Sequence, residues 1–302
     1  MERPPPVGPG ERLGIAALSG PIDPDRLSSG VAALEELGFG TVLASNLRPE
    51  ARLGGRPLFA GSDVERLDAF HQLAADESVA GIIFARGGYG VTRILERVDW
   101  DLLAARPRPY VGYSDLTPLL LGLVARTGTM AFHGPMLVDF ARGLRPDERR
   151  SFLDALAGRR PRPWALEGIS RQSSAGRPQP IEGPLLGGCL TMLAAAVGTG
   201  ALPGFRDSVL VLEDIDEPEY RLDRLLTQVR TSRLTAGIQA VIAGHFTSCD
   251  REARASLIDF AESLDVPLFA GLPAGHEAPN HTFPLGARVR LDPGTATLEV
   301  RS

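Results

Sequence analysis

Lysine is absent from this sequence of 302 residues, and its basic side chains other than five histidines are all arginines. Without an amine side chain the protein cannot form a Schiff base, a pyridoxal phosphate linkage, a Ser–Lys dyad or a Walker A phosphate loop. A nucleophilic serine in this chain would therefore depend on a histidine or a carboxylate as its base.

Cysteine, excess positive charge and long apolar runs are also scarce. Two cysteines, Cys189 and Cys249, do not make a disulfide framework. The net charge of -5 and the scattered arginines argue against a nucleic-acid partner. The N-terminus lacks the apolar core of a signal peptide, and no apolar run reaches membrane-spanning length. We therefore expect a cytoplasmic protein with neither a membrane nor a nucleic-acid partner.

The first half of the chain alternates apolar strands with amphipathic helices, which begin at Asp23-Pro24 and at the capping-box sequence from Ser62. This alternation predicts an α/β fold with a parallel, doubly wound sheet, whose ligands bind beyond the carboxyl ends of the strands. The predicted strands cover residues 13–18, 41–44, 79–85 and 110–112.

The second half is separated by a segment rich in Pro, Arg, Ser and Gly, which is typical of an interdomain linker. Beyond it, strands are predicted at 208–212, 240–243 and 267–270, with a hairpin at 288–298. We therefore expect a smaller, β-rich C-terminal α/β domain. The predicted division is a flexible tail at 1–12, an N-terminal α/β domain at 13–158, a linker at 159–180 and a C-terminal domain at 181–302.

The segment Gly112-Tyr113-Ser114-Asp115 lies between an apolar strand and the start of a helix. A serine at this point is raised into solvent beside helix N–H groups that can stabilise an oxyanion. Asp115 or Thr117 could cap the helix, and Pro118 suits its first turn. The geometry is that of a nucleophile elbow, although the sequence G-x-S-x-G is absent. A helix cap without catalytic function is equally compatible with these residues.

The Gly-rich loop Arg86-Gly87-Gly88-Tyr89-Gly90 follows a predicted strand. It has neither the spacing of a dinucleotide-binding loop nor a Walker lysine, so it is weak evidence for nucleotide binding. Adjacent glycines can present backbone N–H groups at close range to an oxyanion or a carboxylate. The alternative is a turn that needs glycine only for its backbone conformation.

Two acids, Glu213 and Asp214, end a predicted strand, and His276 and His281 follow the last strand before the hairpin. Such acids can orient a histidine, bind a metal or cap a helix. A zinc site of the H-E-x-x-H type does not fit, because the histidines are five residues apart with Pro279 between them. A histidine in a loop after a strand can act as a general base. We expect no metal and no cofactor. We expect His71 to be structural, and for His133 and His245, which are candidates to line a pocket, a structural role is favoured over a catalytic one.

Taken in order, these segments resemble the LD-carboxypeptidases of peptidase family S66, which include muramoyltetrapeptide carboxypeptidases and microcin C self-immunity peptidases. The resemblance covers nearly all of the chain after the N-terminal tail. It is carried by Arg86–Gly90, Gly112–Thr117, His133–Met136, Gly187-Gly188, Leu212–Asp214 with Tyr220–Arg224, and Gly275-His276 with Pro284–Gly286.

The resemblance implies a Ser–Glu–His triad divided between the two domains. Ser114 would be the nucleophile, His276 the base and Glu213 the orienting carboxylate. Backbone N–H groups of Asp115 and of Gly88 or its neighbour would form the oxyanion hole. A carboxypeptidase must also recognise a terminal carboxylate, and without lysine this leaves arginine or backbone N–H groups. We therefore expect substrate contacts at Arg86, Gly87 and Tyr89, with Arg86 on the carboxylate. Pairing of Arg86 with a nearby acid is an equally compatible role. Cys189 stands where relatives usually carry Asn, and a buried, inert thiol is favoured over an alternative nucleophile.

The expected function is a cytoplasmic serine carboxypeptidase of peptidoglycan recycling. It would cleave the L,D bond that releases terminal D-Ala from muropeptide tetrapeptides, so its partner would be a small peptide substrate. A homodimer is compatible with the sequence. One alternative is a microcin C-type peptidase that cleaves a peptidyl- or aminoacyl-nucleotide. A second alternative is a non-catalytic protein that binds small ligands.

Overall fold

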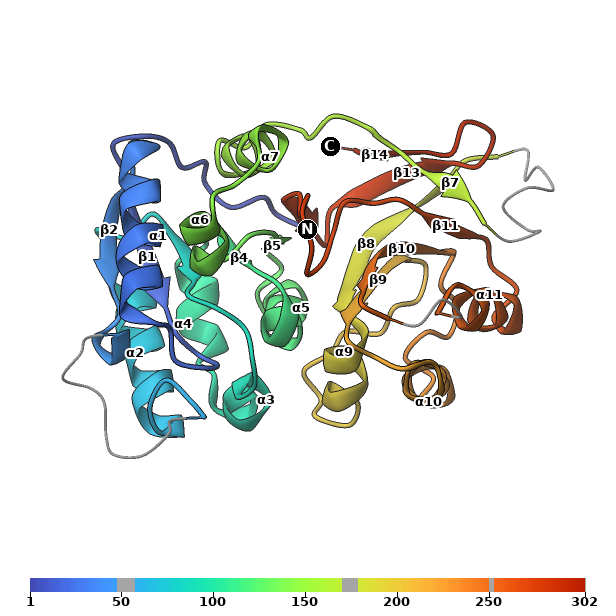
Figure 1. Cartoon of the computed structure of the whole chain (residues 1–302), viewed down its shortest axis with the longest axis horizontal. Helices are drawn as coiled ribbons and strands as arrows, with labels where there is room; N and C mark the ends of the chain where they lie inside the picture. Colours follow the sequence, from blue (N-terminus) through green and yellow to red (C-terminus); the bar gives the residue numbers. More distant parts are fainter. Residues whose placement is uncertain (48–57, 170–178, 250–252, 302) are drawn as a thin grey trace.

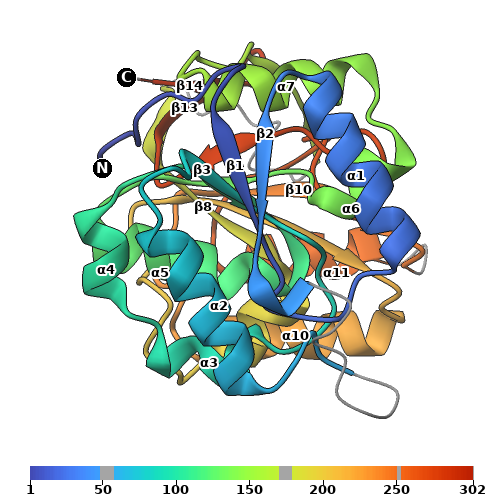
Figure 2. The same ribbon diagram turned by 90° about the vertical axis from the view of Figure 1, so that its left-hand side faces the viewer.

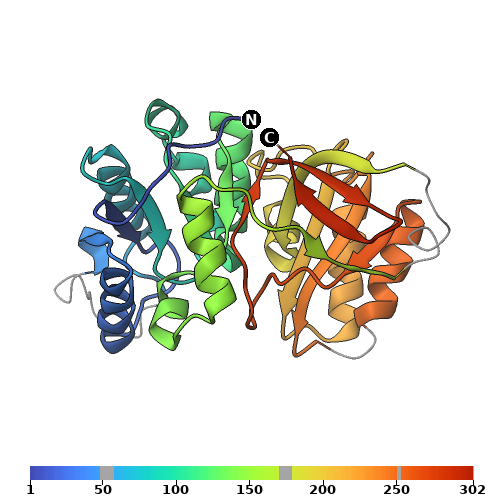
Figure 3. The ribbon, with the colours of Figure 1, turned by 90° about the horizontal axis from the view of Figure 1, so that it is seen from above.

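A computed structural model describes residues 1–47, 58–169, 179–249 and 253–301, which form two halves side by side (Figures 1 and 3). Each half contains one sheet with a parallel core. No helix in the described ranges is both long enough and apolar enough to cross a membrane.

The first sheet has the strand order β12-β5-β4-β3-β1-β2 among the described residues, and β1 to β5 are parallel. Helices α1 and α6 pack together on one of its faces, and α2, α4 and α5 lie on the other (Figure 2). The strands are β1 Arg12–Ala16, β2 Gly40–Leu43, β3 Gly81–Phe84, β4 Tyr110–Gly112, β5 Ala131–His133 and β12 Phe283–Leu285. The helices are α1 Pro24–Glu36, α2 Asp63–Ala75, α3 Val91–Ile94, α4 Trp100–Ala105, α5 Thr117–Thr127, α6 Leu137–Arg142 and α7 Pro146–Leu156.

The second sheet has the order β6-β14-β13-β8-β9-β10-β11-β7 among the described residues. Its core strands β8 to β11 are parallel, and α9, α10 and α11 cover one face (Figure 1). The strands are β6 Trp164–Ala165, β7 Glu167–Gly168, β8 Ile181–Cys189, β9 Val209–Ile215, β10 Ala240–Thr247, β11 Leu268–Ala270, β13 Arg288–Asp292 and β14 Thr297–Val300. The helices are α9 Leu190–Ala196, α10 Glu219–Thr231 and α11 Ala253–Ser263. The predicted two-part α/β fold is thus confirmed.

Of the three helix starts for which the sequence predicted a capping side chain, two have the predicted cap. Asp23 accepts hydrogen bonds from the first turn of α1, and Ser62 with Glu65 forms the predicted capping box of α2. The cap predicted for α5 is wrong, because no side chain caps that helix. The Asp115 carboxylate instead accepts hydrogen bonds from Ser19 Oγ at 2.6 Å and from Val91 N at 3.0 Å.

The chain crosses between the two halves more often than a simple division suggests. Strand β12, from the C-terminal part, pairs antiparallel with β5 of the first sheet. The segment expected to be a linker supplies β6 and β7 to the second sheet, and residues 170–178 of it lie outside the described ranges. Near the N-terminus, Glu2 pairs with Thr129 and Val7 is buried, so the segment expected to be a flexible tail packs on the first domain.

Candidate active site

Ser114 occupies a strained turn between β4 and α5. Its φ of 60° lies in the left-handed region, which non-glycine residues enter rarely and at a cost of about 1–3 kcal/mol. A one-turn 3-10 helix, Ser114–Leu116, follows directly and leads into α5. This is the backbone geometry of a nucleophile elbow, which the sequence predicted without its usual glycine pattern.

A continuous line of hydrogen bonds joins Ser114, His276 and Glu213. Ser114 Oγ lies 3.0 Å from His276 Nε2, and His276 Nδ1 lies 2.8 Å from Glu213 Oε2. A carboxylate only accepts hydrogen bonds, so Nδ1 carries the proton and Nε2 is free to accept the proton of Ser114. Ser114 lies in the turn after β4 of the first sheet, His276 lies on the segment between β11 and β12, and Glu213 lies on β9 of the second sheet.

Gly275 permits the close approach of His276 to Glu213. Its φ is +128°, and a Cβ at this position would lie 2.8 Å from Glu213 Oε2, the oxygen that binds His276. Any side chain there would therefore collide with the carboxylate. Glycine is therefore the residue that fits before His276, because it has no Cβ and tolerates this backbone conformation.

The surroundings of His276 set its basicity. Burial lowers the pKa of the imidazole, but the hydrogen bond and negative charge of Glu213 outweigh burial, and the pKa is raised above its ordinary value of 6.5. Glu213 itself is fully buried. The Tyr113 ring and the imidazole pack edge to face, with ring centroids 5.1 Å apart, which restricts the imidazole plane.

This raised pKa predicts the acid limb of the pH–rate profile. A histidine that acts as a general base must be neutral, so with His276 in this role kcat/KM should fall as pH drops through its pKa, with a midpoint above pH 6.5. In Glu213→Gln the raising charge is lost while burial remains, so the limb should move to lower pH. Residual kcat/KM measured across pH checks this expectation. A limb that moves upward or stays in place would contradict the assignment of the limb to His276.

The Gly-rich loop approaches Ser114 closely at Gly87. A Cβ built on Gly87 would lie 2.8 Å from Ser114 Oγ and 3.5 Å from Asp115 N. Within the described ranges, neither the Asp115 N–H nor the Gly88 N–H donates to a protein acceptor. Gly88 has a φ of +120°, and Gly20 N binds Gly87 O at 3.3 Å, which fixes this loop against the loop after β1. Ser114 Oγ and Asp115 N, one of the predicted oxyanion donors, thus both lie close to Gly87, the residue before Gly88.

The variant Gly87→Ala tests whether activity depends on the close approach of Gly87 to Ser114. The backbone at Gly87 is not left-handed, so alanine fits the main chain, but its methyl group would displace Ser114 Oγ. We expect kcat to fall about tenfold, because small displacements of a nucleophile are costly, while the melting temperature changes little. Gly204→Ala is the matched control, since nothing lies within 4 Å of its Cβ. Equal activity of the two variants would show that activity does not depend on the close approach of Gly87 to Ser114.

Arg86, the first residue of this loop, has no acidic partner among the described residues. Its Nε and Nη1 donate to the carbonyls of Gly87 at 3.2 Å and Pro21 at 3.3 Å. No ion pair with Arg86 is found among the described residues. Pairing with a nearby acid, the alternative role we considered for Arg86, is therefore not observed. Tyr89 is 45% exposed and packs against Phe59, with ring centroids 5.5 Å apart.

Asp214 and Cys189 lie next to Glu213 but have structural partners. Asp214 accepts hydrogen bonds from Thr191 N and Thr191 Oγ1 at the start of α9, so it caps this helix. Cys189 is buried, and burial followed by the charges of Glu213 and Asp214 raises the pKa of its thiol well above the ordinary value. A thiol that resists ionisation is a poor nucleophile, as the sequence predicted.

The other histidines lie outside the hydrogen-bonded line. His71 accepts from Asp99 N at the start of α4, and His245 Nδ1 lies 3.2 Å from the Glu277 carbonyl. His281 binds Asp147 and Trp164. His133 is buried and binds Asn280. The sequence analysis assigned no role to Asn280 or Tyr113, although Tyr113 lies inside the Gly112–Asp115 segment and Asn280 lies between His276 and His281.

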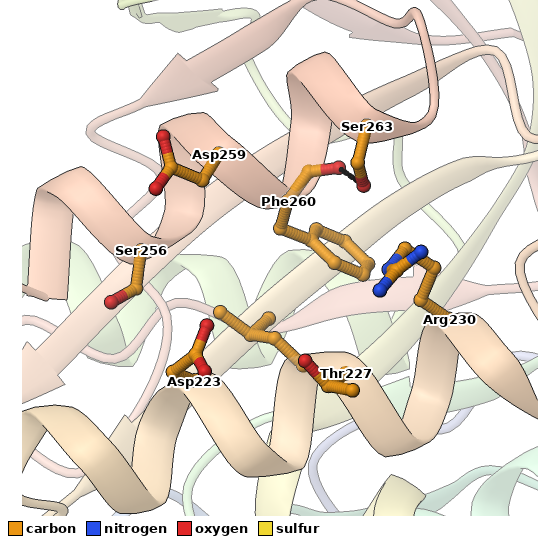
Figure 4. Close-up of a pocket in the computed structure, with 8 residues that line it drawn as sticks. Asp223, Thr227, Arg230, Ser256, Asp259, Phe260 and Ser263 are labelled. Atoms are coloured by element: carbon orange, nitrogen blue, oxygen red, sulfur yellow. Dashed lines mark hydrogen bonds between the residues drawn. The ribbon is translucent and has the colours of Figure 1, made fainter.

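No three His, Cys, Asp or Glu side chains in the described ranges are arranged to hold a metal ion. A pocket of about 230 Å³ lies between α10 and α11, with Leu226 and Phe260 buried and two acids and Arg230 at its edges (Figure 4). None of the predicted site residues lines this pocket.

Two family models match the chain. The LD-carboxypeptidase N-terminal domain matches residues 13–134, and the LD-carboxypeptidase C-terminal domain matches residues 182–291. A murein tetrapeptide carboxypeptidase of Pseudomonas aeruginosa is 34% identical, covering 93% of both chains. A crystal structure of muramoyltetrapeptide carboxypeptidase from Oxalobacter formigenes is 28% identical with a TM-score of 0.83, covering 96% of this chain and 97% of that one.

A second branch of relatives is also similar. The microcin C7 self-immunity protein MccF of Escherichia coli is 26% identical, covering 95% of this chain and 92% of MccF. The structure of an MccF active-site mutant, in which a serine, an asparagine and a lysine are replaced by alanine, shares the fold. It has a TM-score of 0.85 at 23% identity, covering 98% of this chain and 97% of that one.

Proposed function

Because this chain belongs to the LD-carboxypeptidase family, we propose that it is a serine carboxypeptidase that releases terminal D-Ala from muropeptide tetrapeptides. The observation that supports this most strongly is the hydrogen-bonded line Ser114–His276–Glu213, which begins at a strained strand-to-helix turn. A serine with a neutral imidazole at 3.0 Å, itself oriented by a buried carboxylate, has what acyl transfer requires.

In the proposed reaction, Ser114 Oγ attacks the carbonyl carbon of the scissile bond while its proton moves to His276 Nε2. The carbonyl electrons move to oxygen, and the N–H groups of Asp115 and Gly88 would bind the resulting oxyanion. The tetrahedral intermediate collapses by breaking the C–N bond, and His276 gives its proton to the departing D-Ala amine. Water then attacks the acyl-serine ester with His276 again as base, which frees Ser114.

The preference for a C-terminal residue needs a group that recognises a free carboxylate. Arg86 suits this role because it directly precedes Gly87, which lies against Ser114. Its guanidinium has no acidic partner in the described ranges. Arginine binds carboxylates through paired N–H donors, and no lysine exists to replace it. Tyr89 and Gly87 on the same loop would border the peptide.

The alternative, cleavage of an aminoacyl-nucleotide, is supported by similarity to MccF. One observation weighs against it. The MccF active-site mutant replaces a lysine, and this chain contains no lysine that could correspond to it. Identity to the murein tetrapeptide carboxypeptidase is also higher, at 34% against 26%. A cytoplasmic location, a role in peptidoglycan recycling and a homodimer stay predictions.

Product identity distinguishes the two substrates. The purified protein is incubated with a muropeptide tetrapeptide and, separately, with an aminoacyl-nucleotide, and the products are weighed by mass spectrometry. We expect the tetrapeptide to lose one alanine and the nucleotide conjugate to stay intact. Cleavage of the conjugate alone would overturn the muropeptide assignment. Cleavage of neither would leave the non-catalytic alternative favoured.

The proposed mechanism also predicts the response to inhibitors. Ser114 and His276 supply nucleophile and base without a metal, so activity should withstand prolonged treatment with EDTA. Serine-directed acylating or phosphonylating reagents should abolish it, and mass spectrometry should locate the adduct on Ser114. Activity that is lost on chelation and restored by zinc would contradict a serine mechanism.

A further inference from the structure

The base His276 lies on a segment that leaves the second sheet after β11 and ends in β12 of the first sheet. Its partner Glu213 belongs to the second sheet, whereas its other partner Ser114 belongs to the first. The imidazole can serve both only if this crossing segment is held in one place. Asn280, four residues after His276, has the contacts to do this.

The side chain of Asn280 forms a hydrogen bond within the crossing segment, to Gly275, the residue before His276. Its Oδ1 accepts a hydrogen bond from Gly275 N at 3.2 Å and lies 3.1 Å from His133 Nε2. The Gly275 N–H can only donate, which fixes the amide oxygen toward it. His133 must therefore present a protonated Nε2 to the same oxygen. Burial lowers the pKa of His133 to about 3, so the ring is a neutral donor.

The main chain of Asn280 is attached to the first domain. Its N–H donates to Glu148 Oε1 on α7 at 2.8 Å, and Glu148 is fully buried. Two residues later, Thr282 N donates to Ser151 Oγ at 3.0 Å. His133, at the end of β5, stacks on Phe283 of β12. Asn280 is 2% exposed, so water does not replace these partners readily.

We propose that Asn280 is a positioning residue for the base: its side-chain oxygen ties Gly275, and so His276, to His133 of the first domain, within reach of Ser114. Asn280 does not touch the reacting atoms in this assignment. It acts through the backbone at Gly275 and sets the place of the imidazole between the nucleophile and Glu213. This inference rests on the proposed serine mechanism, but not on the identity of the peptide substrate.

The test distinguishes the effect of losing the hydrogen-bond acceptor of Asn280 from the effect of changing the volume of its side chain. Asn280→Asp keeps an oxygen that can accept from Gly275 N and His133 Nε2, whereas Asn280→Leu keeps a similar size without an acceptor. Ser151→Ala is the matched control, because it removes from α7 the acceptor of Thr282 N, which lies on the same segment beyond Asn280. Circular dichroism checks folding, and Asn280→Ala replaces the Leu variant if that variant does not fold.

Three measurements are made on each variant: kcat and KM with the tetrapeptide, the rate of Ser114 labelling by a fluorophosphonate, and the low-field proton resonance of the His276–Glu213 hydrogen bond. We expect Asn280→Leu to lower kcat and the labelling rate about tenfold, with KM little changed and the resonance broadened or shifted. Asn280→Asp should stay within about threefold of the wild type, and Ser151→Ala should keep the wild-type labelling rate and resonance.

Several outcomes would overturn the assignment. Asn280→Leu with wild-type labelling and resonance would make Asn280 purely structural. Equal damage from Asp and Leu would point to volume or charge and not to the acceptor, and equal damage from Ser151→Ala would point to general loosening. Failure of the wild type to cleave the tetrapeptide, with Ser114 still labelled, would overturn only the substrate. If Ser114 is neither labelled nor needed, the proposed function fails, and the resonance alone decides the role of Asn280.

Discussion

Single replacement of Ser114, His276 or Glu213 should lower kcat by roughly 10³–10⁶-fold while the fold survives. Each replacement removes a different part of one proton pathway. Ser114→Ala removes the proposed nucleophile, and His276→Ala removes the proposed base 3.0 Å away. Kinetics on the tetrapeptide, with circular dichroism for the fold, measure these effects.

Glu213→Gln is the most informative of the three. A glutamine amide can donate to Nδ1 of His276, which would place the imidazole proton on Nε2. His276 could then no longer accept the proton of Ser114, although the shape of the site is unchanged. Activity should fall strongly even though Gln fills the space of Glu213.

Double variants should show that the three residues act as a unit. Once Ser114 is replaced, further replacement of His276 or Glu213 should cost little more, so the free-energy changes should be far from additive. Additive losses would mean that the residues act separately. Cys189→Ala is the control for the nucleophile. If it abolished turnover while Ser114→Ala kept it near normal, Ser114 would be the wrong assignment.

The parts of this molecule that depend on local chemistry could be predicted from the sequence. The turn at Ser114 follows from a strand, a glycine and a helix start in consecutive residues. The capping box at Ser62 and the hairpin at Asp292-Pro293-Gly294 are equally local. Parallel strands followed from the alternation of apolar and helical segments. These features need no knowledge of distant contacts.

The parts that depend on distant partners could not be predicted in this way. Asp115 has the position of a cap for α5, but Ser19 and Val91, far away in sequence, take its carboxylate. The crossing of β12 into the first sheet depends on β5, and the role of Asn280 depends on that crossing. Proximity of Glu213 to His276 was expected from family resemblance, since no local pattern pairs residues 63 positions apart.

Arg86→Ala should remove the preference of the enzyme for a free C-terminal carboxylate. Wild type should strongly favour the tetrapeptide over its C-terminal amide, and the variant should lose about 2–3 kcal/mol of this preference, the size of a hydrogen bond to a charged group. The physical reason is that Arg86 is a half-buried cation whose only partners in the described ranges are the carbonyls of Gly87 and Pro21. A carboxylate in the site would supply the missing counter-charge.

The comparison of acid with amide separates this role from a structural one. Losing the contacts to Gly87 and Pro21 could loosen the loop, but a loosened loop would slow both substrates alike, whereas loss of the charge slows only the acid. Arg93→Ala is the matched control, because Arg93 lies on the adjacent helix α3 and is already paired with Asp63. It should leave the preference intact. If Arg86→Ala also kept the full preference, carboxylate recognition would pass to the backbone N–H groups of the Gly-rich loop, which bind anions without a side chain.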